Sequence, residues 1–214
     1  FTFTGNTEPT LETGAGGTQD DVDDNNGNMT VDFGFYVIPD DFGDYSGFAD
    51  ASSMASTTIK LGTAVTDAET VATKNPTATG DDITGTDDED GVSFGALVQG
   101  QTATVTVNRT CSAPAGAYLS AWIDFNNNGS LSDPGEQIIS NVLLPFGTTG
   151  SLGYSFNVPA TAVSGNLGAR FRICSISNPG PTGAVGSGEV EDHIAAITPS
   201  LSIGNLVWGD TNNN

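Results

Sequence analysis

Hydrophobic and polar residues alternate along several stretches of this 214-residue chain, and short runs rich in Gly, Pro and Asn separate them. A period of two places successive side chains on opposite faces of a β-strand. Short strands joined by polar turns are typical of antiparallel sandwiches. The pattern therefore predicts an all-β fold, an antiparallel β-sandwich of the immunoglobulin-like or jelly-roll type. The predicted strands are 29–37, 102–108, 117–125, 136–144, 152–159, 168–176, 189–197 and 201–210.

Helical periodicity is weak by comparison. The best candidate, ASSMASTTIKLG at 51–62, is too rich in Ser and Thr to indicate a helix. No run of about 18 apolar residues occurs, so we expect no membrane insertion. The two ends look like parts of further sheets, with closing strands at 1–38 and an opening strand at 201–214. We therefore expect partial β-sandwich modules at both termini.

Acidic residues dominate the charge: 26 Asp and Glu stand against 5 Lys and Arg, which gives a net charge of −21. Such a chain repels phosphate, so nucleic acid is not an expected partner. Self-repulsion destabilises a compact state unless counter-ions lie close. A salt-adapted surface would explain the charge, but the acids gather in clusters, which favours bound divalent cations.

One stretch, WIDFNNNGSLSDPGE at 122–136, combines an apolar strand end with regularly spaced oxygen side chains. Asp124, Asn126 and Asn128 can each offer one oxygen to a common centre, and Gly129 permits a sharp turn. Calcium accepts six to eight oxygens in flexible geometry, which suits this set. A polar Asn-Gly turn without metal is the alternative. The predicted ligands are Asp124, Asn126, Asn128, the backbone carbonyl of Ser130, and Asp133 or Glu136 as the closing acid.

The C-terminal tail repeats this spacing. Asp210, Asn212 and Asn214 follow Trp208 as Asp124, Asn126 and Asn128 follow Trp122. We interpret the tail as the start of a second loop of the same type, with these three residues as calcium ligands.

Two further groups of acids lie at 87–90 and 189–192. They form either solvated turns or, if they meet in the fold, a second cation site with Asp87, Asp88, Asp90, Glu189 and Glu191 as ligands. Strand alternation places Glu189, Glu191 and His193 on one face and Asp192 on the other, apolar face. Because a buried carboxylate needs a partner, Arg170 and Arg172 on the preceding strand are the candidates.

Cys111 and Cys174 both lie in predicted strands, and no Cys-x-x-Cys motif occurs. In a secreted protein a disulfide across two neighbouring strands is expected. Two buried free thiols are the alternative.

Several motifs resemble the GEVED domain of bacterial extracellular proteins. The naming motif occurs as Gly188-Glu189-Val190-Glu191-Asp192, followed by His193 where the family more often has Tyr. The similarity continues over 61–94, 118–129, 135–136 and 169–173, in order. The segment 41–47 resembles the family's opening motif but lacks its Ala-Pro-Asp. The match spans about 40–198.

The flanks resemble the B-type repeat of serine–aspartate-repeat adhesins (SdrD B-like), a calcium-binding stalk module. TVDFGFYV at 30–37 is similar to its closing strand, and SIGNLVWGDTNNN at 202–214 to its opening strand and first calcium loop. The resemblance implies four parts: the end of a B-type repeat at 1–38, a linker and lead-in at 39–85, a GEVED sandwich at 86–200 and a new repeat from 201.

No catalytic motif stands out. His193 is the only histidine, and no Gly-x-Ser-x-Gly elbow occurs. We therefore expect no enzyme but a calcium-stabilised structural module of an extracellular bacterial surface adhesin or fibre. Its partners would be neighbouring modules or identical subunits, in the latter case by β-strand addition. The alternative is a ligand- or carbohydrate-binding module with an exposed aromatic patch made of Phe33, Phe35, Tyr36, Phe42, Tyr45 and Phe48.

Overall fold

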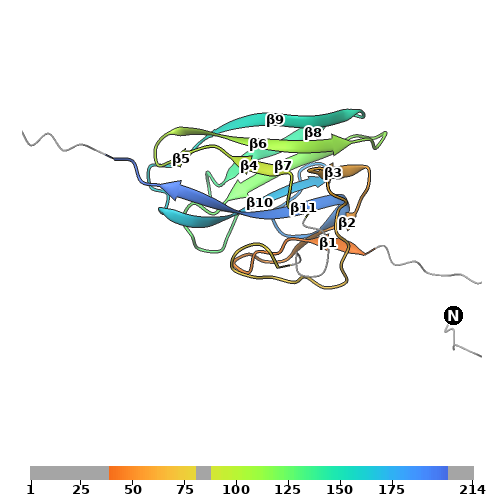
Figure 1. Ribbon diagram of the computed structural model, residues 1–214, viewed down its shortest axis with the longest axis horizontal. Helices are drawn as coiled ribbons and strands as arrows, with labels where there is room; N and C mark the ends of the chain where they lie inside the picture. Colours follow the sequence, from red (N-terminus) through yellow and green to blue (C-terminus); the bar gives the residue numbers. More distant parts are fainter. Residues whose placement is uncertain (1–38, 81–87, 202–214) are drawn as a thin grey trace, which may run out of the picture. The chain divides into compact units, whose positions relative to one another are not determined.

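The computed structural model describes residues 39–80 and 88–201. Several predictions lie outside these ranges. They are the strand 29–37, the strand 201–210 except for Leu201, and the ligands Asp87, Asp210, Asn212 and Asn214. Every regular element within the described ranges is a strand (Figure 1). The strands are β1 Asp40–Phe42, β2 Ala51–Ala55, β3 Ile59–Leu61, β4 Val92–Phe94, β5 Leu97–Val98, β6 Thr102–Cys111, β7 Ala117–Ile123, β8 Gln137–Leu144, β9 Thr148–Asn157, β10 Gly165–Cys174 and β11 Gly183–Thr198.

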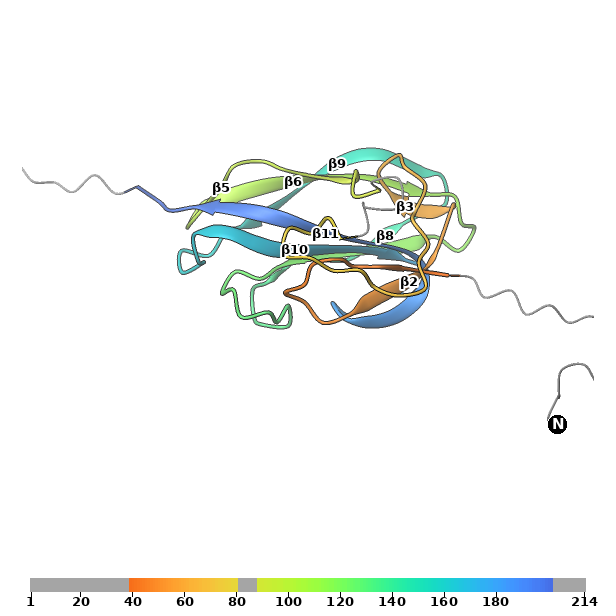
Figure 2. The ribbon, with the colours of Figure 1, turned by 60° about the horizontal axis from the view of Figure 1, so that its bottom comes forward.

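The strands form two stacked sheets, so the predicted all-β sandwich is confirmed (Figures 1 and 2). The larger sheet has the order β1-β2-β11-β10-β7-β8, and β5 also pairs with β11. In the smaller sheet β3, β4 and β9 all pair with β6. Most pairs are antiparallel, but β11 runs parallel to both β2 and β5. Within the described ranges, no helix has the length and apolarity needed to cross a membrane.

The main core lies between the two sheets. Val105 and Val107 of β6 pack with Leu119 of β7 and with Phe171 and Ile173 of β10, all fully buried. A smaller cluster of Phe48, Trp122 and Leu131 covers the other face of the larger sheet. Because both faces are covered, β7 and β10 are buried almost continuously rather than at alternate positions.

Residues 39–80, which we call the lead-in segment, are built into both sheets. They supply β1 and β2 to the larger sheet and β3 to the smaller one, and Ile59 and Leu61 enter the main core. The Ser-rich stretch 51–62 is β2, a turn and β3. The hydroxyl of Ser56 accepts hydrogen bonds from the N–H groups of Thr58 (3.2 Å) and Ile59 (3.1 Å), which fixes that turn.

The two cysteines do not form the predicted disulfide. Both are buried free thiols. Cys111 ends β6 in the smaller sheet and Cys174 ends β10 in the larger one, so they do not lie on neighbouring strands. Each thiol contacts a carbonyl two residues further on, that of Ala113 (3.9 Å) or Ile176 (3.2 Å).

Candidate metal centre

The stretch 122–136 forms a loop that folds back on the carboxylate of Asp124, directly after β7. Asp124 is 2% exposed. Its Oδ1 accepts a hydrogen bond from the N–H of Asn128 (3.1 Å) and its Oδ2 from the N–H of Gly129 (2.8 Å). Asn127 and Gly129 have φ angles of 56° and 82°, the left-handed conformation that this reversal requires. We call residues 124–136 the acidic loop.

Two of the three asparagines of the acidic loop, Asn126 and Asn128, face the same acid. The Nδ2 atoms of Asn126 and Asn128 donate to Oδ2 of Asp133, at 2.9 and 2.7 Å. These two hydrogen bonds lower the pKa of Asp133. Ser130 donates its N–H to Oδ1 of Asn128 (2.8 Å). These contacts join the side chains of Asn126, Asn128 and Asp133, whereas the carboxylate of Asp124 is held by the backbone N–H groups of Asn128 and Gly129.

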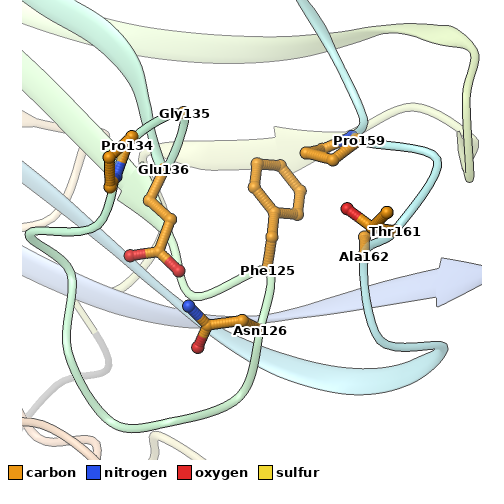
Figure 3. A pocket seen from close by; sticks show the side chains of 8 residues that line it. All are labelled: Phe125, Asn126, Pro134, Gly135, Glu136, Pro159, Thr161 and Ala162. Carbon is orange, nitrogen blue, oxygen red and sulfur yellow. The ribbon is translucent and has the colours of Figure 1, made fainter.

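Glu136 closes the acidic loop from β8's side and is 2% exposed. Its Oε2 accepts from the N–H of Asp133 (3.2 Å), whereas its buried Oε1 has no hydrogen-bond partner among the described residues. Burial raises the pKa of Glu136, and the charges of Asp124 and Asp133 raise it further. The carboxylate points toward Asn126 beside a cavity of about 180 Å³ that Phe125 and Pro159 also line (Figure 3). A buried carboxylate close to other carboxylates is stabilised in its charged form by a nearby positive charge.

The second group of predicted ligands contains both buried and exposed side chains. Asp88, Glu189 and Glu191 are buried. Asp90 is exposed, and its carboxylate accepts from the hydroxyl of Thr63 (2.5 Å). Asp90 therefore belongs to a surface turn, whereas the other three lie inside the fold.

Glu189 is the most deeply placed of these acids, with none of its surface exposed. One oxygen, Oε2, accepts a hydrogen bond from the N–H of Leu61, and Oε1 has no hydrogen-bond partner in the described part of the chain. Burial raises the pKa of Glu189 to about 9, and the charges of Glu191 and Asp88 add to the rise.

Asp41 joins this group although the sequence did not single it out as a ligand. It is 2% exposed, and its Oδ2 accepts from the N–H of Val190 (2.5 Å). Its pKa is raised well above the ordinary value, by burial first and then by the charges of Glu189, Asp88 and Glu69. The only sequence signal was the resemblance of 41–47 to a family motif.

Glu191 and His193 form a separate group with Glu89. The Nε2 atom of His193 lies 2.9 Å from Oε2 of Glu191 and 3.7 Å from Oε2 of Glu89. The other oxygen of Glu191 accepts from the N–H of Gly91 (2.9 Å). One ligand atom from each of the three side chains lies within 4.8 Å of the others, close enough to hold a metal ion.

Asp192 lies on the opposite face of β11 and has the partner that the sequence suggested. Arg170, directly across the β10–β11 ladder, donates to both of its oxygens at 2.7 Å. Both side chains are fully buried. Arg172 instead donates to backbone carbonyls, among them those of Ser52 (2.6 Å) and Gly180 (2.8 Å). The prediction is therefore confirmed for Arg170 alone.

Residues 118–196 match the GEVED domain family. No curated protein matches the chain. The GEVED region, as we call 118–196, contains the acidic loop and both β10 and most of β11. Asp41, Glu69 and Asp88 precede it. The match does not reach the flanks, so the B-type repeats at 1–38 and 201–214 stay predictions.

The first residue of the naming motif in the GEVED region has a packing role. A Cβ on Gly188 would lie 1.9 Å from the carbonyl oxygen of Ile173 and 2.7 Å from Cα of Cys174. No side chain fits between β11 and β10 at this point. Gly188 thereby lets β11 approach β10 where Glu189 turns into the interior.

The predicted aromatic patch is partly covered by the GEVED region. Phe33, Phe35 and Tyr36 lie outside the described ranges. Phe48 is 5% exposed and packs on Trp122 and Leu131, and its ring lies 4.8 Å from that of Tyr45. Phe48 therefore ties the lead-in segment to the acidic loop, and its burial speaks against a binding surface at this position.

We expect the substitution Gly129→Ala to destabilise the fold by about 1–2 kcal/mol, the cost of a left-handed backbone for a residue with Cβ. The new Cβ would also lie 3.0 Å from the carbonyl oxygen of Gly47. Urea unfolding measures the change. Gly135→Ala is the matched control, because Gly135 has a φ of 92° but nothing within 4 Å of its Cβ position. An equal cost for both variants would show that contact with the lead-in segment contributes nothing.

Proposed function

We propose that this chain is a calcium-stabilised structural module of an extracellular bacterial surface adhesin or fibre. One observation carries the proposal: the buried Glu136 carboxylate, whose Oε1 lacks a hydrogen-bond partner in the described residues, faces a loop of oxygen side chains. Leaving a charged oxygen buried without a partner costs several kcal/mol. A bound cation would remove that cost.

The composition of the acidic loop favours calcium. The side chains that it can offer to a cation are three carboxylates and two amides, whose oxygens are all hard ligands. Calcium tolerates such a set, whereas magnesium demands near-ideal octahedral geometry. Two amides in place of carboxylates lower the ligand charge. Weak sites of roughly 10⁻⁴–10⁻³ M are typical of extracellular modules, which supports an extracellular location.

The position of the acidic loop supports a structural role. Leu131 of the loop packs with Phe48 of the lead-in segment and Trp122 of β7. A cation that fixes the loop would therefore also fix the lead-in segment on the GEVED region. In our proposal the module transmits rigidity between neighbouring modules or identical subunits of a stalk or filament.

The experiment is a thermal melt of the full chain in calcium and in excess EGTA. Saturation at about a hundred times the dissociation constant adds roughly 2.7 kcal/mol per site, so the calcium melt should have a clearly higher midpoint. Magnesium at the same concentration should give a smaller increase. Coinciding midpoints in calcium and EGTA would contradict the proposal.

The variant Glu136→Gln tests whether the rise of the melting midpoint in calcium comes from the acidic loop. Because Gln keeps the shape of Glu and removes the buried charge, we expect the variant to melt at or above the wild-type midpoint in EGTA. In calcium its midpoint should rise less than that of the wild type, by the amount that the acidic loop contributes. The matched control is Asp50→Asn, which removes one charge at a side chain that is 76% exposed. The control should keep the full calcium response.

A further inference from the structure

A histidine and two glutamates come together beside β11, outside the acidic loop. Strand alternation puts Glu191 and His193 on the same face of β11, and Glu89 lies just before β4. One ligand atom from each of the three lies within 4.8 Å of the others. Three donor atoms at this spacing can share one ion.

The carboxylate of Glu191 is held in place by the segment before β4. Its Oε1 accepts a hydrogen bond from the N–H of Gly91 (2.9 Å), and the carbonyl of Gly91 accepts from the N–H of Asn108 in β6 (2.7 Å). A Cβ on Gly91 would lie 2.5 Å from Oε1 of Glu191 and 2.7 Å from the backbone nitrogen of Gly62, so this close approach requires glycine. The other oxygen of Glu191, Oε2, contacts the imidazole of His193.

The imidazole ring of His193 is oriented by aromatic neighbours. Phe94 of β4 and Phe171 of β10 both meet it edge to face, with ring centroids 6.5 and 5.8 Å away. Such packing restricts the rotation of the ring and keeps Nε2 beside the two carboxylates. A ligand that is fixed before a metal arrives loses little side-chain entropy on binding.

The Nε2 atom of His193 can donate a hydrogen bond to only one of the two acids, because it carries at most one hydrogen. Oε2 of Glu191 is 2.9 Å away, whereas Oε2 of Glu89 is 3.7 Å away and beyond hydrogen-bond distance. A metal ion in place of that hydrogen bonds to all three atoms, and the neutral ring then carries its hydrogen on Nδ1. Ligand atoms of a tetrahedral zinc ion lie about 3.3–3.4 Å apart, which shifts of roughly half an ångström would achieve here.

The donor set distinguishes this group from a calcium site. Imidazole nitrogen binds zinc and other first-row transition metals, whereas calcium takes oxygen ligands. Zinc sites with three protein ligands take water in the fourth position. The side chains of His193 and Glu89 are 15% and 9% exposed, and that of Glu191 is 1% exposed. An ion would therefore enter from the side of His193 and Glu89, where water can reach it.

We propose that Glu89, Glu191 and His193 form a zinc-binding site. The site joins the segment before β4, a strand of the smaller sheet, to β11 of the larger sheet. A bound ion would therefore tie the two sheets together. The site shares no ligand with the acidic loop and stands whether or not that loop binds calcium.

Nuclear magnetic resonance of the full wild-type chain tests the site directly. His193 is the one histidine in the chain, so its imidazole signals cannot be confused with those of another. In excess calcium, which occupies sites made of oxygen alone, titration with zinc chloride should shift these signals and saturate at one zinc per chain. Imidazole signals that stay unchanged during the titration would overturn the proposal.

Isothermal titration calorimetry with zinc, in the same calcium buffer, compares ligand variants. His193→Gln keeps a side-chain N–H for Glu191 but lacks the imidazole, and Glu191→Gln keeps an oxygen for the N–H of Gly91. Both should weaken zinc binding by at least about 100-fold, because the loss of an outer-shell partner alone typically costs 10–100-fold. A cooperative thermal melt in EDTA confirms that each variant is folded.

Two matched controls should keep the wild-type zinc affinity. Glu189→Gln removes a buried carboxylate two residues away on the same face of β11, but Glu189 is not part of the group. Glu136→Gln removes the closing acid of the acidic loop. Full zinc affinity in folded His193→Gln, or loss of zinc in Glu136→Gln alone, would overturn the proposal. Because the calcium melt of the proposed function is run without zinc, failure of the one site is distinguishable from failure of the other.

Discussion

Replacing Arg170 by Met is expected to cost about 3–5 kcal/mol of unfolding free energy, the usual penalty for leaving one charge of a buried pair without its partner. Asp192 would then keep only weaker neutral donors such as the N–H of Tyr45 (3.0 Å). Arg170 also donates to the carbonyls of Ala49 and Pro181, which would lose their donor. Since domains are stable by only about 5–15 kcal/mol, urea unfolding should show a large shift of the midpoint.

Two further variants distinguish two contributions to this cost: the loss of the ionic partner of Asp192 and the loss of packing by the Arg170 side chain. The double variant Arg170→Met/Asp192→Leu removes both charges, so we expect it to regain much of the stability lost in the single variant. Lys74→Met breaks a pair whose acid, Asp50, is 76% exposed, and should cost no more than about 1 kcal/mol. If Arg170→Met is as mild as Lys74→Met, the buried pair is not a stabilising element.

Raising the pH is expected to destabilise the metal-free chain. The folded-state pKa of Glu189 is about 9, against an ordinary value of 4.5. Between these values the folded chain holds a proton that the unfolded chain has released. This contribution is therefore fully present below pH 4.5 and is lost as the pH rises toward 9. The slope is about 1.4 kcal/mol per pH unit, or roughly 2.7 kcal/mol from pH 5.5 to 7.5.

Urea unfolding in EGTA at pH 5.5, 6.5 and 7.5 tests this slope. Asp41 and Glu136, whose pKa values are also raised, act in the same direction. Acids with lowered pKa values, such as Asp133, titrate below this window. Glu189→Gln should flatten the slope, because Gln does not titrate. Stability that is constant or rises with pH in EGTA would show that Glu189 is ionised in the fold.

The sequence predicted the long strands well because their signal is local. The strands β6 to β11 all overlap stretches of alternating residues. The partnership of Arg170 and Asp192 followed from strand alternation and one assumed strand pair. The acidic loop followed from spacing alone. In each case the information lies within one loop or within one or two strands that are consecutive in the sequence.

The short strands and the approach of Glu69 to Asp41 could not be predicted in this way. β1, β3 and β4 have 3 residues each, too few to show a period, and they form because distant strands offer edges to pair with. Glu69 lies within 61–94, a stretch that resembles the GEVED domain but contains no predicted strand. It comes close to Asp41 through an isolated antiparallel bridge with Asp40, and its N–H donates to the carbonyl of Asp40 (2.8 Å). The cysteines illustrate the same limit, since their sheets are not apparent from spacing.

The parallel pairing of β11 with β2 has a mechanical consequence. The described chain begins beside β1 at one end of the sandwich and leaves after β11 at the other (Figure 1). Tension between these ends pulls β11 along its own axis against β2 and β10. Hydrogen bonds across such strands are loaded in shear, all at once, rather than opened one after another. This connectivity therefore favours resistance to tension applied along β11.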